Sequence, residues 1–97
     1  MTRVQFLVEA AVELAEASAF LARKRRSLDA AFRIEVERAV EVLRGHPLIG
    51  PELSPGLRKL TLHRFPYHVL YRVSESGVLV TNVVHQRRGP DQWVDRE

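Results

Sequence analysis

Residues 65–86 read FPYHVLYRVSESGVLVTNVVHQ and decide the fold of this 97-residue chain. Two stretches rich in β-branched and aromatic residues, 65–73 and 78–86, flank the turn-forming residues 74–77. Such stretches favour strands, and a short polar segment that ends in glycine favours a hairpin between them. We therefore predict two adjacent antiparallel strands, with Pro66 at the start of the first, where a missing N–H is tolerated.

The residues before this hairpin predict a loop and two further strands. Residues 45–57, GHPLIGPELSPGL, combine glycine and proline at short spacing, which predicts a stiff loop. A strand-like stretch at 57–62 follows it. At the other end of the chain, apolar and polar residues alternate over 3–8, which indicates a short strand.

Between the first strand and the loop, the spacing of apolar residues predicts two helices joined by a short turn. The first covers 9–26, with acidic residues early and basic residues late, as the helix dipole favours. Ser27 or Asp29 can cap the second helix, and Gly45 is placed to end it. The basic run 23–26 reads either as a nucleic-acid surface or as a solvated helix end, and we favour the helix end.

The predicted order is β-α-α-β-β-β. It indicates an α+β fold in which an N-terminal antiparallel helix hairpin packs on one face of a mostly antiparallel four-stranded sheet. A short C-terminal tail or helical turn would follow from Pro90. The length fits one domain over residues 1–97.

Composition excludes several classes of protein. Apolar residues make up 45% and charged residues 28%, as in ordinary globular domains. Cysteine is absent, which excludes disulfides and thiolate metal sites. The glutamates among the first twenty residues exclude the apolar core of a signal peptide, and no apolar run could span a bilayer. We therefore expect a cytoplasmic protein with no membrane association.

Arginine dominates the basic residues. Only Lys24 and Lys59 of the 15 basic residues are lysines, and the net charge is +3. Arginine suits planar, bidentate contacts with phosphate or carboxylate groups, so a nucleic acid or an acidic protein segment is the expected partner.

Four segments resemble the toxins of the RelE/ParE superfamily, which belong to bacterial type II toxin–antitoxin systems. LRGHPLIGPEL looks like the family's end-of-helix element, GLRKLTL carries Arg58, and RFPYHVLYRV at 64–73 looks like its central strand. The ending VLVTNVVHQRRGPDQWVDR resembles a His-x-x-Arg-x-Pro motif followed by Trp and Arg, here His85, Arg88, Pro90, Trp93 and Arg96. The resemblance covers nearly the whole chain.

The resemblance implies a toxin neutralised by a cognate antitoxin, within a toxin–antitoxin hetero-oligomer. ParE-like members inhibit DNA gyrase by protein binding, whereas RelE-like members act with the ribosome as metal-independent mRNA endonucleases. A relative that binds an antitoxin without being toxic is a third reading. His68 stands where RelE-like nucleases carry an in-strand arginine, and no tyrosine follows Tyr71. These departures favour the ParE-like reading and leave open whether the chain is an enzyme.

Metal-free RNA cleavage needs proton carriers and cations that stabilise the phosphorane, which histidine and arginine can supply. If the chain is a nuclease, the candidate catalytic residues are His85, Arg64, His68 and Arg58. The candidate residues for binding nucleic acid or a protein partner are Arg58, Lys59, Arg64, Arg72, Arg87 and Arg88.

Each candidate also has a structural reading. Strict alternation places His68 and Arg72 on the sheet face opposite the helices. His63 reads as a loop residue, His46 as a helix cap, and Trp93 as a packing residue rather than a platform for a base. The histidines lack the spacing of metal ligands, so we expect no metal and no cofactor.

Overall fold

The computed structural model describes residues 2–87, which form two helices and a sheet. In chain order the elements are β1 (Val4–Phe6), α1 (Val8–Lys24), α2 (Leu28–Gly45), β2 (Glu52–Ser54), β3 (Leu57–Thr61), β4 (Tyr67–Ser74) and β5 (Gly77–His85). The predicted α+β class is confirmed, and the predicted order of helices and strands holds except for one additional strand. The helical turn predicted from Pro90 lies outside the described residues.

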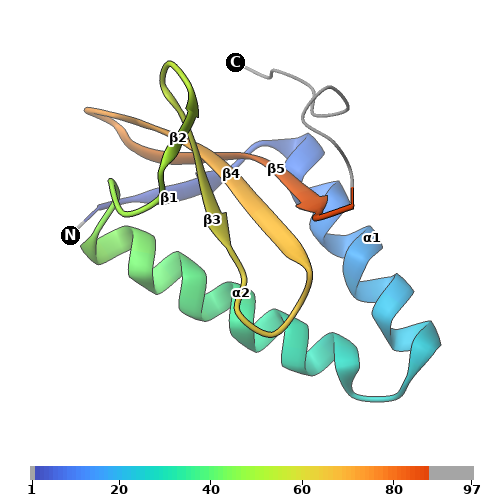
Figure 1. Cartoon of the computed structure of the whole chain (residues 1–97). Helices are drawn as coiled ribbons and strands as arrows, with labels where there is room; N and C mark the ends of the chain where they lie inside the picture. The colour runs from blue at the N-terminus through green and yellow to red at the C-terminus, as the bar shows by residue number, and fades with distance from the viewer. Residues whose placement is uncertain (1, 88–97) are drawn as a thin grey trace.

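The strands lie in the order β1-β5-β4-β3-β2. β1 pairs in parallel with β5, and the other neighbours are antiparallel. Figure 1 shows α1 and α2 on the same side of this sheet, so its other face carries no helix among residues 2–87.

The prediction of four strands was wrong by one, because residues 52–54 form the additional strand β2. β2 pairs with the start of β3 through a tight turn in which Gly56 adopts φ +80°. Pro55 and Gly56, which contributed to the prediction of a loop, form this turn. The three residues of β2 are all exposed, and three residues give too short a pattern to indicate a strand.

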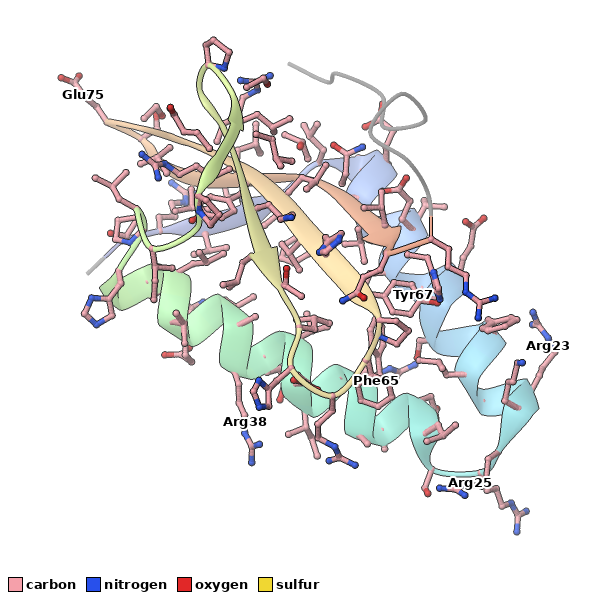
Figure 2. All side chains as sticks on the ribbon, viewed as in Figure 1. Arg23, Arg25, Arg38, Phe65, Tyr67 and Glu75 are labelled. Atoms are coloured by element: carbon pink, nitrogen blue, oxygen red, sulfur yellow. The ribbon has the colours of Figure 1, made fainter. Side chains whose placement is uncertain are left out.

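Ser27 holds the N-cap position of α2, as predicted, but its side chain makes no capping hydrogen bond. Its backbone instead adopts the left-handed conformation at φ 71°, which reverses the chain between the two helices. Figure 2 shows Arg23 and Arg25 pointing away from the fold near this turn, in agreement with a solvated helix end.

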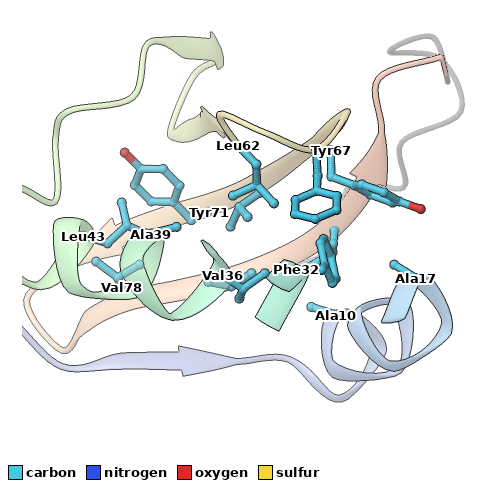
Figure 3. Packing of buried hydrophobic residues seen from close by; sticks show 14 of the residues in the cluster. Ala10, Ala17, Phe32, Val36, Ala39, Leu43, Leu62, Tyr67, Tyr71 and Val78 are labelled. Carbon is cyan, nitrogen blue, oxygen red and sulfur yellow. The ribbon is translucent and has the colours of Figure 1, made fainter. Parts of the chain in front are cut away.

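The core lies between the helices and the sheet (Figure 3). Phe32 of α2 makes an edge contact with Phe65, at 5.4 Å between ring centroids, and lies 5.2 Å from the Tyr67 ring. Tyr71 and Leu43 are fully buried nearby. Each such side chain contributes about 1.5–3 kcal/mol of transfer free energy, so these residues hold α2 against β4.

A bulge in β5 determines which of its residues face the helices. Tyr71 pairs with Val80 and Leu70 with Asn82, which leaves Thr81 as the extra residue. Val83 and His85 therefore share the helix-facing side with Val80, although strict alternation would place them on the other side. Because of the bulge, valines before and after it, Val78, Val80 and Val83, are all buried against the helices.

Candidate functional site

The face of the sheet without helices carries three of the predicted basic residues. Lys59 of β3 pairs with Leu70 of β4, so their side chains lie on the same face of the sheet. His68 and Arg72 lie two positions before and after Leu70 on β4 and therefore share that face. This face, defined by Lys59, His68 and Arg72, is called the open face below. The predicted placement of His68 and Arg72 opposite the helices is confirmed by the strand register.

His68 is the titratable group at the centre of the open face. Its Nδ1 lies 2.9 Å from the Thr61 hydroxyl on the neighbouring strand. Burial lowers the pKa of His68 below its usual value, and electrostatic interaction with Lys59, and next with His85, lowers it further. At neutral pH the ring is therefore uncharged, the form that can accept a proton.

Arg72 anchors the turn between β2 and β3 beside the open face. Its Nη1 donates to the carbonyl oxygen of Pro55 at 3.5 Å. The guanidinium also lies close to Gly56, where an added Cβ would approach Nη1 to 3.1 Å. Arg72 thus contributes to the architecture of the hairpin as well as to the charge of this face.

Arg58 faces the other way and organises the loop after α2. Its Nη1 donates to the carbonyl oxygens of Leu48 at 3.1 Å and Gly50 at 2.7 Å. The Gly50 N–H in turn donates to the buried Tyr71 hydroxyl at 2.9 Å. These bonds give Arg58 a clear structural role that the sequence pattern did not reveal.

Arg64 lies in the exposed loop between β3 and β4, which α2 holds in place. The Glu35 carboxylate accepts hydrogen bonds from the backbone N–H of His63 at 2.6 Å and of Arg64 at 2.9 Å. The guanidinium carbon of Arg64 lies 5.8 Å from the centroid of the Phe65 ring. As predicted, His63 is an exposed loop residue.

His85 lies on the helix-facing side of the sheet, at the end of β5. Its ring meets the Tyr67 ring at 5.1 Å in an edge contact, and its Nδ1 accepts the Arg87 N–H at 3.0 Å. His85 and His68 are on neighbouring strands but project to opposite faces, since His85 pairs with Tyr67 and His68 with Val84.

The four residues predicted as catalytic are thus not gathered on one face. His68 alone lies on the open face; Arg58 and His85 lie on the helix side, and Arg64 lies in a loop. Of the predicted partner-binding residues, Lys59 and Arg72 accompany His68, and Arg87 is exposed just after β5. Arg88 lies outside the described residues.

Two carboxylates with defined roles escaped the sequence analysis. Glu35 binds the loop at 63–64, and Glu13 of α1 accepts the Val83 N–H at 2.8 Å. Both join residues far apart in the chain, so no local spacing could have revealed them. Within residues 2–87, no group of three or more histidine or acidic side chains could hold a metal, and no helix could cross a membrane.

This fold is similar to that of solved structures of the ParDE and RelBE toxin–antitoxin systems, as the motifs predict. No protein-family model matches the sequence, and no curated protein matches it. Solved structures do match. A chain of the chromosomal ParDE toxin–antitoxin system from P. aeruginosa superposes with a TM-score of 0.76 at 20% identity, over 88% of this chain and 96% of that one.

Two structures from E. coli have the same fold. The isolated RelE toxin matches with a TM-score of 0.62 at 23% identity, over 94% of this chain and 90% of that one. A chain of the intact RelBE toxin–antitoxin complex matches with a TM-score of 0.61 at 24% identity, over 91% of this chain and 100% of that one. At these identities the likeness establishes the fold.

Proposed function

We propose that this chain is the toxin of a type II toxin–antitoxin module, a single cytoplasmic domain over residues 1–97 that a cognate antitoxin neutralises. The fold it shares with the ParDE and RelBE structures supports this role. An antitoxin is then its natural partner, and the functional complex is a hetero-oligomer.

We further propose that the toxin is ParE-like and inhibits DNA gyrase by binding it. The observation that carries this choice is the placement of His68 and His85 on opposite faces of the sheet. A metal-free nuclease needs its proton carriers and its phosphate-binding cations around one scissile bond. The higher TM-score with the ParDE chain, 0.76 against 0.62 for isolated RelE, supports the same choice.

The test combines two assays. Purified chain is added to gyrase in a supercoiling assay, and messenger RNA 5′ ends are mapped after induction without an antitoxin. We expect dose-dependent loss of supercoiling, and growth arrest with intact messages. His85→Ala should preserve this toxicity wherever the variant folds. New cuts inside translated regions, with gyrase unaffected, would contradict the proposal.

A RelE-like mRNA endonuclease is the second candidate, because the open face combines an uncharged histidine with two cations. In that case His68→Asn should abolish cleavage while antitoxin binding persists. His63→Asn is the matched control, since His63 lies in the loop and away from this face. A folded chain that neither slows growth nor cuts RNA would instead be a non-toxic relative.

A further inference from the structure

Four consecutive basic residues, Arg23, Lys24, Arg25 and Arg26, lie at the end of α1 and in the turn before α2, and we call them the basic turn. All four side chains are exposed, and Figures 1 and 2 show this turn at one end of the molecule. Of the 15 basic and 12 acidic residues of the chain, the basic turn holds four basic ones and no acidic one, so the rest of the chain has a net charge of −1. The whole positive excess of the protein therefore lies here.

A solvated helix end accounts for only part of this run. Arg23 and Lys24 lie in the last turn of α1, where cations interact favourably with the helix dipole. Arg25 and Arg26 follow the helix, and the dipole interaction falls off within its last turn. No carboxylate among residues 2–87 forms an ion pair with any of the four, so the adjacent like charges repel one another. Two of the four cations thus have no stabilising role within the described residues.

Hydrogen bonds fix the backbone that carries these cations. The Arg25 N–H donates to the carbonyl oxygen of Leu21 at 3.1 Å, and the Arg25 carbonyl oxygen accepts the Leu28 N–H at 3.3 Å. The left-handed conformation of Ser27, at φ 71°, completes the reversal of the chain. Figure 2 shows the Arg25 side chain pointing away from the fold. The positive charges therefore project into solvent from a turn of defined shape.

We propose that the basic turn binds the phosphate backbone of duplex DNA. Each guanidinium can donate two parallel hydrogen bonds to one phosphate, and cations on a fixed backbone need little ordering when they bind. A single strand would instead need a free aromatic ring on which its bases stack. Phe20 is the aromatic residue next to the run, and the Nζ of Lys24 already lies 5.1 Å from its ring centroid. The site therefore suits a duplex better than a single strand.

Such a contact would keep the chain on the DNA that gyrase holds, and this role rests on the proposed function, whereas DNA binding itself does not. The test therefore omits gyrase. The purified full chain is titrated into a fluorescent DNA duplex of mixed sequence, and anisotropy is followed at several salt concentrations. Four phosphate contacts predict a slope of log affinity against log salt of about −3.6, or a fall of about 150-fold between 50 and 200 mM salt.

The double variant Arg25→Gln/Arg26→Gln removes two of these contacts. Its slope should be about −1.8, so that the same change in salt weakens binding only about 12-fold. Arg3→Gln/Arg38→Gln is the matched control, since it has the same net charge and both residues are exposed outside the basic turn. The control should keep the affinity and slope of the unaltered chain. The urea midpoint of the first variant should not fall, because it loses repulsion and no ion pair.

Three results would overturn the proposal. Equal losses of affinity in the two double variants would indicate attraction to the chain as a whole. Tighter binding of a single strand or of duplex RNA would assign the basic turn to another nucleic acid. Displacement of the DNA by an equal charge of polyglutamate would assign it to an acidic protein segment. DNA binding that follows the predicted slopes, in a chain that leaves gyrase active, would instead establish the basic turn and remove the proposed gyrase target.

Discussion

The carboxylate of Glu13 accepts a hydrogen bond from the backbone N–H of Val83 at 2.8 Å, across 70 positions of sequence. It does so where β1 has ended and no neighbouring strand among the described residues supplies an acceptor. The side chain of α1 thereby completes the hydrogen bonding of β5, because a buried N–H without a partner would cost stability.

Glu13→Ala should therefore lower the free energy of unfolding by about 1–3 kcal/mol, since Val83 loses its acceptor. Glu13→Gln keeps an acceptor oxygen and should lose less than half as much. Urea denaturation measures both, with Glu9→Ala as a surface control expected within about 0.5 kcal/mol of the unaltered chain. Equal stability of the alanine and glutamine variants would show that the Val83 bond contributes nothing.

Glu35 determines the conformation of the loop that carries His63 and Arg64. Glu35→Ala should accelerate hydrogen exchange of those two amides selectively and lower stability by about 1 kcal/mol, because two backbone donors lose a charged acceptor. Glu37→Ala on the same helix is the control, since Glu37 is exposed and remote from the loop. Unchanged exchange at both amides would contradict this role.

The pKa of His68 should be below its ordinary value of 6.5, chiefly because of burial and next because of Lys59. The unfolded chain then binds the proton more readily than the folded one. His68 thus favours folding above pH 6.5, and this contribution is lost as the pH falls through the folded pKa. NMR titration of the ring should show the low midpoint, and Lys59→Gln should raise it. A midpoint that Lys59→Gln leaves unchanged would remove the charge of Lys59 as a cause.

Gly50 has room for no side chain. A Cβ there would lie 2.3 Å from the carbonyl oxygen of Lys59 and 2.8 Å from the Tyr71 hydroxyl. Gly50→Ala should therefore destabilise the fold by about 2 kcal/mol or more, since backbone must move. Gly45→Ala meets nothing within 4 Å at the end of α2 and should be neutral or stabilising by up to about 1 kcal/mol. Thermal unfolding of the two variants measures this difference in stability. Similar melting temperatures would contradict the close packing of the Lys59 backbone and the Tyr71 hydroxyl around Gly50.

The spacing of apolar residues along the sequence was sufficient to predict much of the architecture. The helix hairpin, the β4–β5 hairpin and the α+β class follow from apolar spacing and turn residues, because local periodicity reports which side of each element is buried. The alternation around Val69 and Tyr71 correctly assigned His68 and Arg72 to the open face.

Tertiary structure alone decided what the candidate residues do. The bulge at Thr81 places His85 on the side of the sheet that faces the helices. The register of β3 places Arg58 where its guanidinium donates hydrogen bonds to the carbonyl oxygens of Leu48 and Gly50. Because β1 pairs only with residues 78–80, the later part of β5 has no strand on that side among the described residues, and the Glu13 carboxylate accepts the Val83 N–H there. Such long-range pairings depend on which elements become neighbours, and the spacing of residues within one element does not encode that choice.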